Sequence, residues 1–133
     1  MNKTELNRVL DDMKPNRISK SVERQLYDKA IEKWGAEAQI GMMIEECAEL
    51  TLAISHLGRK RGSVIDIIEE MVDVEIMLKQ MEIVFKKLNP ELQKNFDEVY
   101  RVIRDEKLAR LRDMLEKDGV KIIDDKHAVR DAQ

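Results

Sequence analysis

Residues 64–88 carry apolar side chains at steps that alternate between three and four, which is the spacing of a helical packing seam. The seam comprises Val64, Ile67, Met71, Val74, Leu78, Met81, Phe85 and Leu88. A second apolar strip in the same segment comprises Ile65, Ile68, Val72, Ile76 and Ile83. A helix that is apolar on two sides lies at the centre of a bundle or in a subunit interface. The segment therefore predicts a long helix that needs neighbours on more than one side.

The rest of the chain also favours helices. Its 133 residues include only 5 glycines and 2 prolines, while 43% are hydrophobic and 38% charged. Interruptions at Gly35, at "GRKRG" (58–62) and at "NP" (89–90) separate expected helices at 3–13, 21–34, 36–57, 64–88 and 91–117. We expect one all-α domain, an antiparallel helical bundle, at 21–118. An N-terminal helix and linker (1–20) precede it, and a weakly ordered tail (119–133) follows.

Composition excludes several functions. The net charge of −3 and the 4% aromatic content are unsuited to binding a nucleic-acid polymer. The sequence contains no run of 18 uncharged residues, the length needed to span a bilayer. We therefore expect a cytoplasmic protein without a membrane partner. The only cysteine, Cys47, excludes an intrachain disulfide and is predicted to be a buried small hydrophobe.

Acidic residues interrupt two of the most apolar segments. Glu46 and Glu49 are three residues apart, as are Glu70 and Asp73, so each pair shares one face of its helix. Helices joined by a short loop are antiparallel neighbours, so the two pairs are expected to meet. Basic residues that could pair with them along the helix are nearly absent from 40–58 and 63–78.

Such crowding has a cost. Two like charges 4 Å apart repel by about 4 kcal/mol at an effective dielectric constant of about 20. The acids therefore point outward to solvent, are partly protonated, or surround a cation. Oxygen ligands suit Mg²⁺ or Mn²⁺. A di-iron bundle would need Glu-x-x-His motifs, which neither His56 nor His127 supplies.

The motif "EECAE" (45–49) followed by "EMVD" (70–73) resembles the E-E-x-x-E and E-x-x-D signature of the MazG-like all-α nucleoside triphosphate pyrophosphohydrolases. "WGAEAQ" (34–39) before the first acids, the basic loop, and "KLAR" (107–110) are also similar to that family. The resemblance covers about residues 21–115.

The resemblance implies an oligomeric enzyme, a dimer or tetramer, that cleaves a nucleoside triphosphate between its α and β phosphates. It implies Mg²⁺ (or Mn²⁺) bound by Glu46, Glu49, Glu70 and Asp73. Glu45, one position from Glu46, would orient or deprotonate the attacking water. Lys107, Arg110, Arg59 and Lys60 are candidates to contact phosphate, and Gln39 and Trp34 are candidates to contact the base. For Trp34 the alternative is packing in the core.

Two other functions stay open. Phosphoribosyl-ATP pyrophosphohydrolases share the implied fold, although "WGAEAQ" fits them less well. A dimeric helical interaction module without catalysis would account for the seam at 64–88, but it would not need an acidic pair on each helix.

Overall fold

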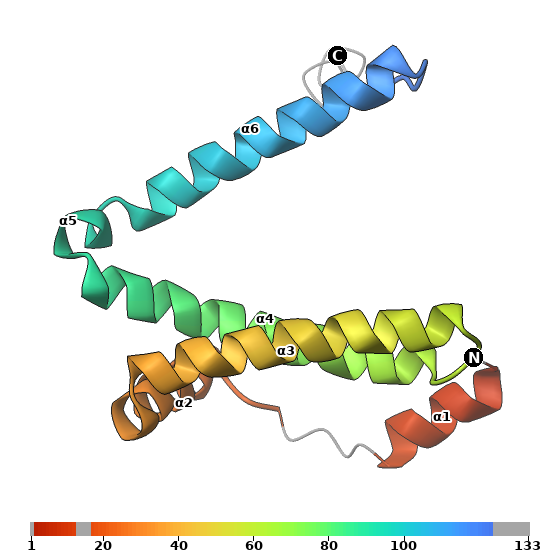
Figure 1. Cartoon of the computed structure of the whole chain (residues 1–133), viewed down its shortest axis with the longest axis horizontal. Coiled ribbons are helices and arrows are strands. Elements are labelled where there is room, and N and C mark those ends of the chain that lie inside the picture. Colours follow the sequence, from red (N-terminus) through yellow and green to blue (C-terminus); the bar gives the residue numbers. More distant parts are fainter. Residues whose placement is uncertain (1, 13–16, 124–133) are drawn as a thin grey trace, which may run out of the picture. The chain divides into compact units, whose positions relative to one another are not determined.

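The computed structural model describes residues 2–12 and 17–123, and every regular element in these ranges is an α-helix (Figure 1). The elements are α1 (Lys3–Asp12), α2 (Lys20–Trp34), α3 (Ala36–Gly58), α4 (Val64–Leu88), α5 (Pro90–Gln93) and α6 (Phe96–Lys117). The all-α class is thus confirmed. The middle of the predicted linker and the tail beyond residue 123 lie outside the described residues. In the described ranges, no helix combines the length and apolarity needed to cross a membrane.

The chain divides into two units, residues 1–89 and 90–133. In the second unit, the prediction of one helix from residue 91 to 117 was wrong at its start. Pro90 begins the short helix α5, because a proline at the first helical position loses no hydrogen bond. The Asn95 N–H then donates to the Leu92 carbonyl at 3.0 Å, and α6 begins at Phe96. Gly119, with φ of 84°, follows its end.

In the first unit, α2 begins at Lys20, one residue earlier than expected, because Ser19 caps it. The Ser19 side chain accepts a hydrogen bond from the Val22 N–H at 3.3 Å. Gly35 separates α2 from α3, as predicted, with φ of 88° and ψ of 156°. Its N–H donates to the Ile31 carbonyl at 2.9 Å, which closes the last turn of α2.

Helices α3 and α4 form a hairpin and pack along each other (Figure 1). The connecting loop turns through Lys60 and Gly62, which have positive φ values of 58° and 73°. Ser63 then caps α4. Its hydroxyl accepts from the Asp66 N–H at 3.2 Å, and the Asp66 carboxylate accepts from the Ser63 N–H at 2.6 Å. This reciprocal cap fixes where the second arm of the hairpin begins.

A small core lies where α2 packs against α3 and α4. It comprises Ile31, Met77, Met81, Ile83 and Val84, with Tyr27, Ala36, Ile40 and Met43 packed against it. Of the predicted seam on α4, only Met81 belongs to this core. Val64, Met71, Leu78, Phe85 and Leu88 are exposed in the single chain. Most of the apolar surface of the hairpin therefore has no cover from the described part of this chain.

The predicted burial of Cys47 was wrong, since its side chain is exposed on α3. Ile44, three residues earlier on the same helix face, is exposed as well. The helical pattern around Cys47 identified an apolar region, but burial there requires something beyond the single chain to pack on it.

Candidate functional site

Three acidic side chains meet across the α3–α4 hairpin. Glu46 and Glu49 lie on α3 and Glu70 on α4, and one carboxylate oxygen from each lies within 4.8 Å of the other two. The spacing of three residues puts the α3 pair on one helix face, and the short loop brings α4 alongside. The structure thus brings together three of the four residues predicted to bind a metal ion.

The pKa values of two of these carboxyls are raised. For Glu46 the largest cause is burial, followed by the charges of Asp73, Glu49 and Glu70. For Glu70 the largest cause is again burial, followed by the charges of Glu49 and Asp73 and by a hydrogen bond that the protonated group can donate to Glu49. Each effect disfavours a cluster in which all the acids are ionised.

No lysine or arginine compensates this cluster within the described chain. Glu46, Glu49 and Glu70 take part in none of its ion pairs, which join other acids to neighbouring lysines and arginines. The Glu70 Oε2 atom is buried and has no hydrogen-bond partner among the described residues. An uncompensated carboxylate oxygen beside two others is the donor set that a hard divalent cation prefers. The residues present therefore suit Mg²⁺ or Mn²⁺.

Asp73 and Glu45 lie outside the three-carboxylate cluster of the described residues. Asp73 is exposed on α4, yet its charge still raises the pKa of both Glu46 and Glu70. Glu45 is exposed on α3, and its charge contributes to the raised pKa of Glu46. Both side chains are thus close enough to influence the cluster electrostatically.

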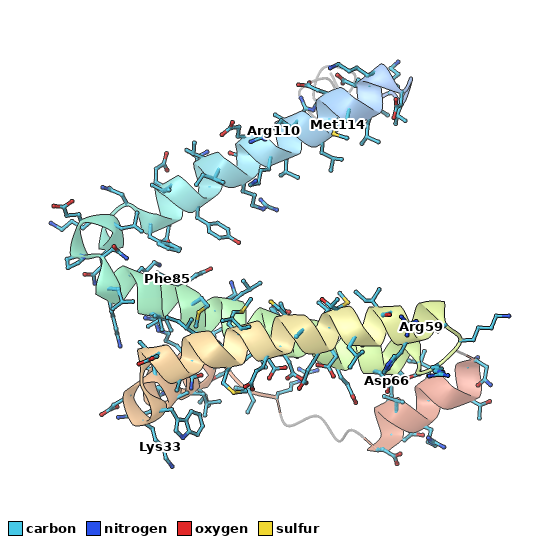
Figure 2. All side chains as sticks on the ribbon, in the orientation of Figure 1. Lys33, Arg59, Asp66, Phe85, Arg110 and Met114 are labelled. Atoms are coloured by element: carbon cyan, nitrogen blue, oxygen red, sulfur yellow. The ribbon has the colours of Figure 1, made fainter. Side chains whose placement is uncertain are left out.

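The cluster adjoins a cavity of about 290 Å³ toward the loop end of the hairpin. Glu49 and Glu70 line it together with Leu52, Ala53, His56, Gly62 and Asp66. Figure 2 shows Asp66 and Arg59 at this end of the molecule's first unit. Sequence reasoning did not include His56 or Asp66 in the site. Their positions carried a signal, since His56 follows Glu49 by seven residues and Asp66 precedes Glu70 by four.

The residues predicted to contact phosphate lie in two places. Arg59 and Lys60 are exposed in the hairpin loop of the first unit. Lys107 and Arg110 are exposed on α6 in the second unit, where Arg110 pairs with Glu106 at 3.5 Å. The roles of all four stay predictions.

The two residues predicted to contact a base differ in accessibility. Trp34, at the end of α2, is 60% exposed, so the alternative of core packing is wrong for the single chain. The Lys33 ammonium lies 5.8 Å from the centre of its ring. Gln39 is only 4% exposed in the first turn of α3, which leaves little of its amide accessible to a ligand.

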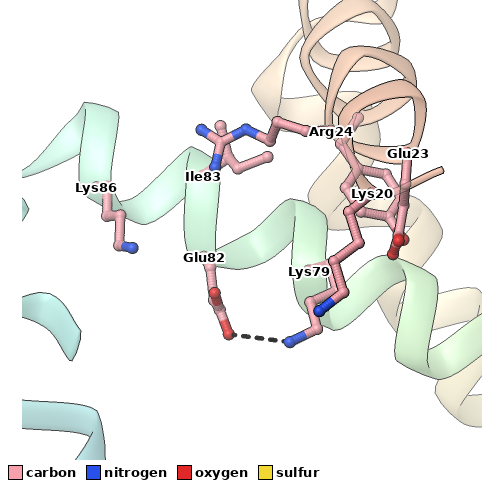
Figure 3. Close-up of a pocket in the computed structure, with 8 residues that line it drawn as sticks. Lys20, Glu23, Arg24, Lys79, Glu82, Ile83 and Lys86 are labelled. Carbon is pink, nitrogen blue, oxygen red and sulfur yellow. Dashed lines mark hydrogen bonds and ion pairs between the residues drawn. The ribbon is translucent and has the colours of Figure 1, made fainter.

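A charged cavity of about 380 Å³ lies between α2 and α4 (Figure 3). Its cationic side chains are Lys20, Arg24, Lys79 and Lys86. Acids neutralise part of this charge, because Glu82 lies 4.0 Å from Lys79 and Asp28 lies 3.2 Å from Arg24. Charge pairs of this kind on a surface are ordinary, so this cavity is a weaker candidate than the acidic cluster.

Tyr27 forms part of the same cavity and also packs against the core. Its hydroxyl donates to the Glu23 carboxylate at 2.6 Å. Burial, and then this hydrogen bond, raise the pKa of Tyr27 to about 12. The phenol therefore stays neutral at physiological pH and acts here as a fixed hydrogen-bond donor.

Comparisons of the chain with protein-family models, with curated proteins and with solved structures give no match.

Proposed function

We propose that this protein is a Mg²⁺-dependent nucleoside triphosphate pyrophosphohydrolase, which releases a nucleoside monophosphate and pyrophosphate. One observation carries the proposal. Three carboxylates from two helices converge within 4.8 Å, and one of their oxygens is buried with no partner in the described ranges. The sequence resemblance described above assigns the same residues to the metal site of such enzymes, and nucleotide-pool maintenance would be the physiological role.

The chain's own residues take distinct parts in this proposal. Glu46, Glu49 and Glu70 would hold the ion, and Asp73 would contribute from the next turn of α4. Bound there, Mg²⁺ would neutralise triphosphate charge and polarise a phosphoryl oxygen. Glu45, exposed beside the cluster, would orient or deprotonate the attacking water.

Cations are needed where charge accumulates on the leaving pyrophosphate. Arg59 and Lys60, in the hairpin loop, are the candidates from the first unit. Trp34, exposed at the end of α2, would stack on the base, and Gln39 would need to move to reach its edge.

We also propose that the chain works as a bundle-forming homo-oligomer. Ile44, Leu52 and Ile54 on α3, and Met71 and Val72 on α4, are exposed large apolar side chains on one hairpin. Apolar surface of this extent marks an interaction site. A second copy of the chain offers the same surface, so a symmetric interface would bury both.

The proposal is tested by incubating the full chain with canonical and modified (d)NTPs and Mg²⁺, and by measuring pyrophosphate and orthophosphate separately. We expect pyrophosphate in equal amount to nucleoside monophosphate. Glu49→Gln should abolish the activity, whereas Glu91→Gln, an exposed acid of α5, should not alter it. Orthophosphate as the sole product would contradict the proposed site of cleavage.

A second candidate function is a helical interaction module without catalysis. The exposed apolar surface of the hairpin favours it, because a scaffold needs such a surface and an enzyme of this size does not require it. The module would show self-association with no response to divalent ions, which separates it from the proposed hydrolase.

A further inference from the structure

An apolar cavity of about 450 Å³ lies between α2 and α4, and it is separate from the acidic cluster. It is lined by Ile18, Glu23, Leu26, Tyr27, Ala30, Trp34, Ile76 and Gln80. Two of these residues are aromatic and four are aliphatic, so the lining suits a flat, largely apolar group. The volume lies in the range of small-molecule sites.

Gln80 is the unusual residue in this lining. It is only 6% exposed, and its neighbours Met77, Met81, Ile83 and Val84 form the apolar core. Within the described residues, its amide Nε2 donates to the Met77 sulfur at 3.6 Å, and its Oε1 is buried and has no hydrogen-bond partner. A buried amide oxygen without a donor destabilises the fold, so its presence beside a cavity suggests that a ligand supplies the donor.

We propose that this cavity binds a planar heteroaromatic ring whose N–H group donates to the Gln80 amide. Trp34 and Tyr27 supply the aromatic surfaces that contact the ring. Identifying the ring as a nucleobase rests on the proposed function. The assignment replaces Gln39, which lies elsewhere on α3, with Gln80 as the residue that reads the base edge.

The amide has freedom to make this contact. Sulfur is a weak acceptor, so little is lost when the side chain rotates about its last torsion and turns its oxygen toward the cavity. Rotation by half a turn would present the amide N–H₂ instead. The unsatisfied group is the oxygen, however, so the orientation that accepts from a ring N–H is the one that removes the buried unpaired atom.

The cavity also lies at a suitable distance from the acids. Gln80 follows Asp73 by seven residues on α4, which corresponds to a rise of about 10.5 Å on nearly the same helix face. A nucleotide with its base at Gln80 and its phosphates near Asp73 would lie extended along α4. The two sites are thus compatible with a single ligand.

Trp34 provides the readout, since it is the only tryptophan of the chain and lines the cavity. Its fluorescence is followed while the full chain, in EDTA, is titrated with adenosine or with purine riboside. Purine riboside has the same ring system but no N–H donor on the base. We expect saturable quenching by adenosine and binding of purine riboside weaker by about tenfold. Equal binding of the two nucleosides, or binding of neither, would overturn the proposal.

Two variants localise the effect. Gln80→Met removes the amide while keeping the length of the side chain, and it should abolish the preference for adenosine. Gln25→Met, at an exposed position of α2, should retain the preference. The melting temperature of Gln80→Met should equal or exceed that of the wild type, because a buried unsatisfied oxygen is replaced by an apolar group. A lower melting temperature with the preference intact would show that the amide serves the fold alone.

Nucleosides carry no phosphate and EDTA removes metal ions, so this test is independent of hydrolysis. Nucleotide hydrolysis without preferential binding of adenosine would refute the ring site and leave the proposed function standing. Preferential binding of adenosine without nucleotide hydrolysis would support the ring site and refute the proposed function. The alternative is that a second copy of the chain fills the cavity. Trp34 emission would then change with self-association but not with added nucleoside, and this result also refutes the ring site.

Discussion

Glu49 on α3 and Glu70 on α4 face each other across the helical hairpin, with a carboxylate oxygen of one within 4.8 Å of a carboxylate oxygen of the other. Twenty residues of chain lie between them. Burial, and then the charge of Glu49, raise the pKa of Glu70, and its buried Oε2 has no hydrogen-bond partner in the part of the chain that the structure describes. The hairpin therefore holds together two groups that repel when both are ionised.

The raised pKa of Glu70 predicts a pH dependence of stability in the absence of metal ions. The folded-state pKa of Glu70 is raised above its ordinary value of 4.5, so the folded state binds more protons than the unfolded state between the two values. The free energy of unfolding must then fall as pH rises through that window. Glu70→Gln removes this contribution. The stability of the variant relative to the wild type, measured by thermal melts in EDTA, should rise as pH increases from about 4.5 and level off above the folded-state pKa.

Glu32, which has a neighbouring lysine, provides the control for the Glu70 variant. Lys29 holds the pKa of Glu32 below its ordinary value, so Glu32→Gln should change relative stability in the opposite direction as pH rises. The same upward trend in both variants would show that the acidic cluster is not the source of the effect.

Mg²⁺ should stabilise the folded chain. An ion that binds only the native state raises the free energy of unfolding by about 2.7 kcal/mol at a hundred times its Kd. Thermal melts in Mg²⁺ and in EDTA should therefore differ, and Glu46→Gln or Asp73→Asn should lose the difference. Glu91→Gln should keep it. An absence of any shift at millimolar Mg²⁺ or Mn²⁺ would favour the interaction module over the enzyme.

Ile31 should be important for the packing of α2 against the hairpin. It is the buried residue that α2 contributes to the core. Ile31→Ala should lower the free energy of unfolding by about 2–5 kcal/mol, because the removed methyl groups leave a cavity. Urea denaturation followed by circular dichroism measures the loss. Ile123→Ala, at a highly exposed position, should change stability by no more than about 0.5 kcal/mol.

The exposed face of the hairpin predicts self-association. We expect sedimentation velocity to show a dimer or a larger assembly of the wild-type chain. Met71→Glu should shift the chain toward the monomer, since it places a charge in an apolar interface. Gln25→Glu adds the same charge at an exposed polar position of α2 and should leave the assembly unchanged. A wild-type chain that sediments as a monomer at all concentrations would contradict the proposed oligomer.

The features that sequence predicted well are those that depend on neighbouring residues in the chain. The break at Gly35 and the helical period of 64–88 are local, and both are present in the structure. The convergence of Glu46 and Glu49 with Glu70 also follows from local rules, because helix periodicity and one short loop suffice to bring them together.

The features that the sequence did not predict depend on which surfaces pack against each other in the folded chain. The helical pattern around Cys47 does not reveal whether another surface covers it, and in the single chain nothing in the described residues does. The buried amide oxygen of Gln80, which has no partner among the described residues, could not be foreseen either. A glutamine within an apolar helix is compatible with exposure, with a hydrogen bond to a neighbour, or with burial, and only coordinates distinguish these.

The backbone at Gly35 has φ of 88° and ψ of 156°, a region that is nearly exclusive to glycine, although a methyl group there would meet no atom within 4 Å. This corner connects α2, which carries Trp34 and Tyr27, to the hairpin that carries the carboxylates. A change in the backbone angles at Gly35 would tilt α2 while leaving the carboxylates of the hairpin in place. Selectivity for the ring could thus evolve by reorienting α2, independently of the groups that handle phosphate.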